Sequence, residues 1–260
     1  MRLRRSLLAG LLASTFLLAL SGPAGAIVGG SDDSAHPYVG LLDNGSEGCS
    51  GTLISPRVVV TAAHCFAGAS SLWGTDQGQP KIRVTFDQQG IFNESRTLYY
   101  GAFYSDPQFC QPCGNGTNRF DDHDLAVVVL DSSAQMATYG RLPTRNFDDS
   151  LRKKAKLDVV GYGVQAFTAP GQPNLDAVWT RFSATVQLLD GDKGQNGNFL
   201  KVSPAQCLGD SGGPVFVAGT NQLVAEMSYG DTRLCDKPGF DYRLDGDALD
   251  WIAATAAAHA

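Results

Sequence analysis

The sequence predicts an all-β fold, built as barrels or sandwiches, with one helix at its C-terminal end. Short apolar runs rich in β-branched residues recur along the chain, separated by turns that contain Gly, Pro or Asn. This regular alternation of short strands and turns is typical of antiparallel sheets. The strand–helix alternation of parallel folds is not visible in the sequence. Only residues 247–252 and the alanines that follow have helical propensity, with Leu249 and Ile252 spaced to pack on one face.

The strand-like runs fall into two groups that are joined by a polar connection. Residues 131–156 contain Pro143, Asn146 and the basic run 152–154, so they predict an exposed link. We therefore expect two domains, residues 27–145 and residues 146–260. The expected strands are residues 38–42, 49–54, 58–60, 82–86, 96–99, 125–130, 157–163, 178–183, 199–202, 215–217 and 223–230.

Residues 1–26 predict a signal peptide that is removed on export. Three arginines precede an apolar run over residues 7–20, and the Ala-Gly-Ala sequence at 24–26 matches a small-residue cleavage site. A membrane anchor is the alternative interpretation. The apolar run is short for a bilayer and is interrupted by Ser14 and Thr15, which favours a signal peptide and a secreted protein.

The composition indicates a globular protein and limits its partners. The chain of 260 residues is 43% hydrophobic and 18% charged, which is typical of a protein with a folded core. Its net charge of −6 becomes more negative when the three arginines of the signal peptide are removed, which argues against nucleic acid or an anionic membrane as the main partner. The six cysteines of an exported chain predict disulfides rather than a metal site. We expect a monomer without a metal or another cofactor.

The most informative segment is residues 207–214, in which Ser211 is flanked by glycines. Glycine allows a sharp turn and a close approach of the backbone to a ligand. A serine at such a turn can act as a nucleophile once a base removes its proton. The N–H groups of Gly209 and Ser211 would point at one spot, as an oxyanion hole requires. A Gly-rich surface turn is the alternative interpretation of this segment alone.

A candidate base, His64, comes soon after the expected strand 58–60. The hairpin formed by this strand and the preceding one would bring Cys49 close to Cys65, so we predict a disulfide that holds the loop of His64. A core histidine and a metal ligand are the alternative interpretations of His64. No other histidine lies at the spacing of a metal site.

A candidate acid, Asp124, stands directly before the apolar run 125–130. A carboxylate at such a position needs a partner, because an unpaired buried charge is costly. His64 is the obvious partner. We favour Asp124 over Asp121 and Asp122 because the apolar run begins immediately after it.

Cys110 and Cys113 form a C-x-x-C pair in an expected loop. Such a pair is compatible with a redox motif or with a disulfide that closes a small loop. Because the chain is exported and has no βαβ pattern, we predict the loop disulfide Cys110–Cys113.

His64, Asp124 and Ser211 supply a base, an orienting acid and a nucleophile in that chain order. In this order and in six stretches the chain resembles the chymotrypsin-like (trypsin-fold) serine peptidases. The resemblance implies two antiparallel six-stranded β-barrels, with the active site in the cleft between them, and a C-terminal helix. The matching stretches are Ile27-Val28-Gly29-Gly30, Thr61-Ala62-Ala63-His64-Cys65, Asp124-Leu125-Ala126-Val127-Val128-Val129-Leu130, Gly161-Tyr162-Gly163, Gly209-Asp210-Ser211-Gly212-Gly213-Pro214 and Ser228-Tyr229-Gly230.

The resemblance also implies the roles of the catalytic residues. His64 takes the proton from Ser211 and later returns it to the leaving amine, while Asp124 fixes the imidazole tautomer. The N–H groups of Gly209 and Ser211 hold the oxyanion.

Further residues are assigned by the same resemblance. Ser228, Tyr229 and Gly230 bind the substrate backbone as an added strand, and a Cys207–Cys235 disulfide frames the specificity pocket. The freed α-amino group of Ile27 pairs with Asp210 and shapes the oxyanion hole. Because signal cleavage after Ala26 itself exposes Ile27, we expect no propeptide of useful length.

The specificity pocket is expected to accept large side chains. In this family the pocket floor lies six residues before the nucleophile, which is Ala205 here. Ala205 cannot attract a basic side chain, and Gly230 and Gly239 leave the pocket walls open. We therefore expect a preference for bulky apolar or aromatic residues before the scissile bond. Asp231 or Asp241 is close enough in the sequence to add charge near the pocket.

These features together predict a secreted serine endopeptidase that acts on protein or peptide substrates through an acyl-enzyme. Two other functions use the same features. A non-catalytic binding protein of this fold commonly lacks a triad residue, whereas all three are present here. An esterase or acyl transferase would share the acyl-enzyme chemistry and differ in its substrate.

Overall fold

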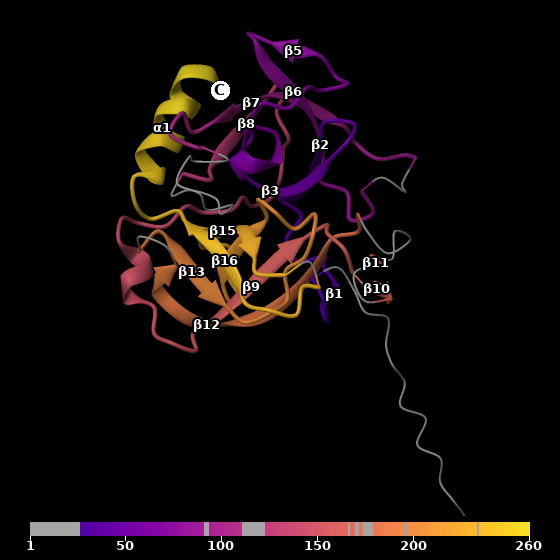
Figure 1. Ribbon diagram of the computed structural model, residues 1–260. Coiled ribbons are helices and arrows are strands. Elements are labelled where there is room, and N and C mark those ends of the chain that lie inside the picture. Colours follow the sequence, from indigo (N-terminus) through magenta and orange to yellow (C-terminus); the bar gives the residue numbers. More distant parts are fainter. Residues whose placement is uncertain are drawn as a thin grey trace, which may run out of the picture.

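The structure is a computed structural model, and it describes residues 27–90, 94–110, 123–165, 167–169, 172–173, 179–194, 197–232 and 234–260. It contains two closed six-stranded antiparallel β-barrels and a C-terminal helix, α1 (Ala248–His259), so the predicted fold class is confirmed. Figure 1 shows one barrel above the other, with α1 at the side of the upper barrel. The predicted signal peptide, residues 1–26, lies outside the described residues.

The first barrel is built from strands in the first half of the chain. These strands are β2 (Val39–Asp43), β3 (Gly48–Ser55), β4 (Val58–Thr61), β6 (Gln79–Thr85), β7 (Tyr99–Ser105) and β8 (Ala126–Leu130). Their order is β2-β3-β4-β8-β7-β6, and β6 pairs with β2 to close the ring, while the short strand β5 (Thr75–Asp76) pairs antiparallel with the beginning of β6. Every residue of β4 and β8 is buried, as is typical of strands covered on both faces, and α1 packs against β8.

One strand of the first barrel differs from the expected one. The strand expected over residues 96–99 begins only at Tyr99. Gly101 in β7 packs so closely on β8 that a Cβ atom would lie 2.5 Å from the carbonyl oxygen of Val129. A glycine that is required by close packing looks like a turn residue in the sequence, which explains the early placement.

The second barrel is built from strands in the second half. These strands are β9 (Lys156–Gly161), β12 (Phe182–Gly194), β13 (Phe199–Val202), β14 (Pro214–Val217), β15 (Leu223–Gly230) and β16 (Gly239–Arg243). Their order is β12-β13-β16-β15-β14-β9, and β9 pairs with β12 to close the ring. The first strand of the described residues, β1 (Ser31–Asp32), also pairs with β12, so the segment that precedes the first barrel lies on the second barrel.

Short elements connect the barrel strands. They are the hairpin of β10 (Phe167–Ala169) and β11 (Gln172–Pro173), and the 3-10 helices η1 (Ala63–Cys65) and η2 (Phe147–Ser150). Among the described residues, no helix combines the length and apolarity needed to cross a membrane.

Buried apolar side chains form two clusters. The larger cluster fills the first barrel and continues across the interface to Tyr162 and Phe216 of the second half. The other cluster fills the second barrel and includes Ile27, which is fully buried. Since complete burial of a large aliphatic side chain contributes roughly 1.5–3 kcal/mol, Ile27 anchors the start of the chain to the second barrel.

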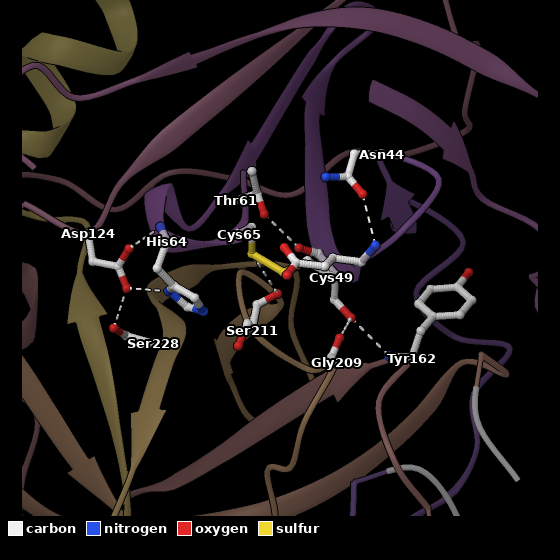
Figure 2. Close-up of a disulfide and its surroundings, with 12 residues drawn as sticks. Asn44, Cys49, Thr61, His64, Cys65, Asp124, Tyr162, Gly209, Ser211 and Ser228 are labelled. Atoms are coloured by element: carbon white, nitrogen blue, oxygen red, sulfur yellow. Dashed lines mark hydrogen bonds and ion pairs between the residues drawn. A yellow bond between two sulfur atoms is a disulfide. The ribbon is translucent and has the colours of Figure 1, made fainter. Parts of the chain in front are cut away.

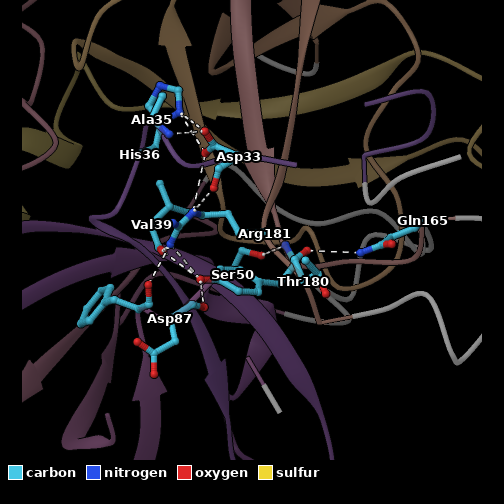
Figure 3. A network of polar contacts seen from close by, with 11 residues as sticks. Asp33, Ala35, His36, Val39, Ser50, Asp87, Gln165, Thr180 and Arg181 are labelled. Atoms are coloured by element: carbon cyan, nitrogen blue, oxygen red, sulfur yellow. Dashed lines mark hydrogen bonds and ion pairs between the residues drawn. The ribbon is translucent and has the colours of Figure 1, made fainter. Parts of the chain in front are cut away.

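A buried arginine, Arg181, joins the two barrels (Figure 3). It lies just before β12, and its guanidinium donates to the carbonyl oxygens of Val39 at 3.1 Å and Phe86 at 2.8 Å. It also donates to the carbonyl oxygen of Asp33 at 3.2 Å, and its Nε lies 3.7 Å from the Asp33 carboxylate. Because Arg181 is only 3% exposed, these bonds form away from water and are strengthened by the low local dielectric.

The carboxylate of Asp33 is held from a second side by His36, whose Nδ1 lies 3.0 Å from Oδ2. Burial alone would raise the pKa of Asp33, but the bond to His36 and the nearby positive charges lower it below its ordinary value. The His36 ring also stacks on Phe216 of β14, with ring centroids 5.2 Å apart. The ionised Asp33 therefore links the segment before β2 to Arg181 and the second barrel.

We predict that Arg181→Met lowers the free energy of unfolding by about 3–5 kcal/mol, because it leaves the buried Asp33 carboxylate without its arginine. Urea unfolding followed by tryptophan fluorescence measures this change. The matched control is Arg145→Met, since Arg145 pairs with Asp250 on the surface at 2.6 Å, where an ion pair contributes little. Equal effects of the two substitutions would contradict the role given to Arg181.

Candidate active site

His64 is positioned by the chain on both sides of it. It lies in η1, directly after β4. The predicted Cys49–Cys65 disulfide is confirmed, with the two α-carbons 6.2 Å apart, and it ties η1 to β3. The imidazole is therefore presented from a short segment that is held at both ends (Figure 2).

Asp124 is fully buried next to His64 and accepts three hydrogen bonds. Its Oδ2 lies 2.7 Å from Nδ1 of His64, and its Oδ1 accepts the backbone N–H of His64 at 2.8 Å. The Ser228 hydroxyl, from β15 of the second barrel, also donates to Oδ2. Burial would raise the pKa of Asp124, but the charge of His64 and these bonds hold it below its ordinary value. Asp124 therefore stays ionised and orients the imidazole, whereas Asp121 and Asp122 lie outside the described residues.

Ser211 is held near His64 by contacts of its turn with the first barrel. Its carbonyl oxygen accepts the N–H of Ser50 in β3 at 2.8 Å. The next residue, Gly212, has φ of +76°, and a Cβ atom there would clash with Thr61 and lie 2.6 Å from the carbonyl oxygen of Ser50. In Figure 2 the imidazole lies between Asp124 and Ser211, and His64 and Ser211 line one cavity. The structure thus brings together the three residues predicted from the sequence.

Two backbone donors next to the Ser211 hydroxyl are available to a ligand. Within the part of the chain that the structure describes, the N–H groups of Gly209 and Ser211 donate to no protein acceptor, whereas those of Gly212 and Gly213 are bonded. Gly209 has φ of +93°, which glycine adopts without strain. Its carbonyl oxygen accepts the Ser50 hydroxyl at 3.0 Å, so the turn is fixed from the first barrel.

Asp210 is fully buried beside this turn. Its two carboxyl oxygens accept the N–H groups of Gly163 and Cys207, each at 2.8 Å, and the backbone N–H of Ile27 is also bonded to it. Burial raises the pKa of Asp210 to about 7, and the three N–H donors offset only part of that shift. Ile27, the first residue after the expected cleavage site, therefore lies against a buried acid that has no positive partner among the described residues.

A cavity of about 360 Å³ opens beside Ser211. Three predicted substrate-binding residues line it, namely Ser228, Tyr229 and Gly230. Leu208 and Met227 add apolar surface to its wall. The predicted Cys207–Cys235 disulfide is confirmed, and both cysteines border the same cavity. The predicted Cys110–Cys113 bond falls outside the described residues, because Cys113 does.

Two residues expected in the pocket do not reach the cavity. Ala205 belongs to the apolar cluster of the second barrel and is 4% exposed. Gly239 is covered by the side chain of Gln206, which lines the cavity instead. Ala205 was expected to form the floor of the pocket because it lies six residues before Ser211. That spacing does not show that the side chain of the next residue, Gln206, lines the cavity instead.

Two buried acids next to the site received no role from the sequence. Glu226 is two residues from Ser228 on β15, while Asp241 of β16 pairs with Met227. Among the described residues, the donor to Glu226 is the backbone N–H of Gly212, and the donor to Asp241 is the side chain of Gln206. Burial raises the pKa of Asp241 to about 8, and burial together with the charges of Asp124 and Asp241 raises that of Glu226 far above its ordinary value. An acid inside an apolar strand was the signal that could have revealed Glu226.

One group of residues near the site has the atom types of a metal site. Cys49, His64 and Cys65 place such atoms within 4.8 Å of one another. The two sulfurs are bonded to each other, however, and only a thiolate binds a metal well. We therefore assign the two cysteines to a crosslink rather than to a metal site.

The family model for trypsin matches residues 27–252 of the chain. The chain belongs to the trypsin family. It is 28% identical to a trypsin from Sus scrofa over 243 residues, which cover 90% of this chain and 96% of that protein. It is 29% identical to a chymase from Macaca fascicularis over 257 residues, which cover 91% of this chain and 93% of that protein.

This trypsin-family chain is also similar in fold to solved structures. Human heparin binding protein matches with a TM-score of 0.66 at 20% identity, covering 87% of this chain and 95% of that one. HL collagenase matches with a TM-score of 0.65 at 19% identity, covering 88% of this chain and 96% of that one. At these identities the likeness concerns the double-barrel fold.

We predict that Glu226→Gln stabilises the protein relative to the wild type increasingly as the pH rises above about 4.5. The unfolded chain ionises Glu226 near its ordinary pKa of 4.5, whereas the folded chain keeps the proton because its pKa is raised. The wild type therefore loses stability as the pH rises, and glutamine, which cannot ionise, does not.

Urea unfolding midpoints at about pH 4, 6 and 8 measure this difference. The matched control is Glu47→Gln, because Glu47 is exposed and its removal leaves the pH dependence unchanged. A gap between wild type and Glu226→Gln that stays constant over this range would show that Glu226 ionises normally in the fold.

Proposed function

We propose that this trypsin-family chain is a secreted serine endopeptidase that hydrolyses peptide bonds through an acyl-enzyme intermediate. The observation that carries the proposal is that His64 and Ser211, from different barrels, line one cavity while the ionised Asp124 holds the imidazole from behind. His64 takes the proton of the Ser211 hydroxyl as its oxygen attacks the carbonyl carbon. His64 then gives this proton to the leaving amine, and a water molecule repeats the sequence to release the acid.

The developing negative charge on the substrate oxygen needs donors that are already in place. The N–H groups of Gly209 and Ser211 fit this role, since they make no bond within the described residues. Their position does not depend on the substrate, because the Ser50 hydroxyl holds the carbonyl oxygen of Gly209. Fixed donors of this kind stabilise the tetrahedral intermediate without reorganising during the reaction.

A peptide substrate would add a strand beside residues 228–230 of β15. Strand β14 pairs only with residues 223–226, whereas β16 pairs with Tyr229 and Gly230. Residues 228–230 also line the cavity beside Ser211. An extended peptide can bind beside such a strand through its backbone, whatever its side chains are.

The cavity favours a bulky apolar or aromatic side chain before the scissile bond. Its volume of about 360 Å³ is large enough for an aromatic ring. Leu208, Met227 and the Cys207–Cys235 disulfide supply apolar surface. Such a side chain needs no charged residue in the cavity in order to bind.

We also propose that cleavage after Ala26 completes the site. The ammonium group thus formed on Ile27 would supply the positive partner that the buried Asp210 does not find among the described residues. The two disulfides of the described residues agree with this route of export, because disulfides persist in oxidising compartments.

Ser211→Ala is expected to abolish labelling by a fluorophosphonate probe and to lower the turnover of peptide substrates by about 10⁵–10⁶-fold, because the nucleophile is lost. Gel fluorescence and a chromogenic peptide assay measure the two effects. The matched control is Ser46→Ala, which removes an exposed serine outside the cavity and leaves both readouts unchanged.

Other outcomes point to other functions. A wild-type protein that takes no label would be a binding member of the family, and the peptidase proposal would be rejected. Labelling with ester turnover but without peptide turnover would identify an esterase or acyl transferase instead.

A chain that begins at Ile27 is expected to be at least about tenfold more active at neutral pH than a chain that keeps two residues before it, because only the former places a positive charge beside Asp210. Activity of the shorter chain should fall as the pH rises above the pKa of its α-amino group, ordinarily about 8. Asp210→Asn in the shorter chain should reduce its activity to that of the longer one. Equal activity of the two chains would remove the role of Ile27.

A further inference from the structure

Two polar residues, Gln206 and Asp241, lie at the inner end of the cavity beside Ser211, whose walls are largely apolar. Asp241 is fully buried, and the side chain of Gln206 is its hydrogen-bond partner. The amide oxygen of Gln206, which lines the cavity, is buried and has no hydrogen-bond partner among the described residues. A buried polar atom costs about 1–3 kcal/mol when its bond is missing, so this oxygen calls for a ligand.

The strand register places Asp241 at this inner end. In β16 it pairs with Met227 of β15 on one side and with Leu200 of β13 on the other. Side chains of directly paired residues project from the same face of an antiparallel sheet. Met227 reaches the cavity from that face, and Met227 and Leu200 both belong to the apolar cluster of the second barrel. The Asp241 carboxyl group therefore lies behind the cavity in apolar surroundings.

Gln206 connects the open part of the cavity to Asp241. Its side chain crosses Gly239, where even a Cβ atom would clash with the amide. The amide lowers the pKa of Asp241 in part, but burial dominates and raises it to about 8. Asp241 and Gln206 thus present two neutral polar groups, and the glycine at position 239 provides the space that the amide fills.

The chemistry of these groups defines what complements them. A purely apolar side chain in the cavity would leave the buried amide oxygen of Gln206 unpaired. A side chain with a hydrogen-bond donor at its far end would bond to this oxygen, which Asp241 holds in place from behind, while its apolar part contacts Met227 and Leu208. A site that contains buried polar groups discriminates strongly against an analogue that lacks the matching group.

We propose that Gln206 and Asp241 make the cavity select a large side chain that ends in a hydrogen-bond donor, as tyrosine does, over the same side chain without the donor, as in phenylalanine. This inference rests on the proposed peptidase function and narrows the class of bulky residues expected before the scissile bond. Gln206 and Asp241 determine specificity and take no part in the bond-breaking steps.

Two pairs of peptide anilides, differing only in the residue before the scissile bond, test the proposal. One pair carries tyrosine or phenylalanine at this position, and the other carries lysine or norleucine. In each pair only the first residue ends in a hydrogen-bond donor. We expect kcat/KM for tyrosine to exceed that for phenylalanine by at least about tenfold, the effect of one buried hydrogen bond. The lysine pair tells whether a charged donor is accepted as well.

Substitution by leucine assigns the selectivity to its residues. Asp241→Leu and Gln206→Leu should each bring the tyrosine-to-phenylalanine ratio close to one. Leucine has nearly the shape of aspartate and removes a buried polar group, so the Asp241 variant keeps its fold. The matched control is Asp236→Leu, because Asp236 is exposed and does not line the cavity, and it should keep the wild-type ratio.

Three outcomes would overturn the proposal. They are equal turnover of tyrosine and phenylalanine by the wild type, a ratio that survives both leucine substitutions, and a preference for lysine without one for tyrosine. Tyrosine selectivity that both substitutions remove supports it, whether or not lysine is also cleaved.

Binding to the Ser211→Ala protein separates this inference from the peptidase proposal. NMR titration with N-acetyl-tyrosinamide and N-acetyl-phenylalaninamide reports on the cavity without catalysis. Selective binding of the tyrosine compound in a protein whose wild type takes no fluorophosphonate label would reject the peptidase and keep the cavity assignment. Equal binding of the two compounds, with normal labelling of the wild type, would reject the cavity assignment alone.

Discussion

The site depends on one buried charge, the carboxylate of Asp124. It accepts the backbone N–H and lies against the ring of His64, which belongs to the first barrel, and it accepts the hydroxyl of Ser228 from the second. A carboxylate that is fully removed from water is stable only when its oxygens are satisfied in this way. The need to satisfy Asp124 therefore fixes the imidazole and joins β15 to the first barrel with the same set of bonds.

The buried acids around the site differ in charge because they differ in their donors. Asp124 has three donors, and its pKa is lowered. Asp210 has three backbone donors, but burial still raises its pKa to about 7. Glu226 and Asp241 have fewer donors, the backbone N–H of Gly212 and the side chain of Gln206, and burial raises their pKa values further from the ordinary range. The neutral forms of Glu226 and Asp241 are therefore favoured, which limits repulsion of the Asp124 carboxylate that orients His64.

Local patterns predicted an all-β fold, the Cys49–Cys65 disulfide and the candidate triad, whereas the two six-stranded barrels and the Cys207–Cys235 disulfide followed from the resemblance to a known family. The glycines around Ser211, the histidine after a strand and the acid before an apolar run each have a local signal. The positions of Gln206 and Asp241 at the cavity have no local signal in the sequence. They depend on the register between β15 and β16 and on the side chain of Gln206 crossing Gly239. The buried bonds of Arg181 were equally invisible, since their acceptors are backbone carbonyls far along the chain.

Gly212 owes its identity to the docking of the barrels rather than to the reaction. Its missing side chain lets the turn lie against Thr61 and Ser50 of the first barrel. A descendant of this chain that exchanged Ser211 and kept only a binding role would still need a glycine at position 212, because the steric conflict does not involve the hydroxyl. Persistence of the glycine in such lineages would thus mark shared architecture and not hydrolytic activity.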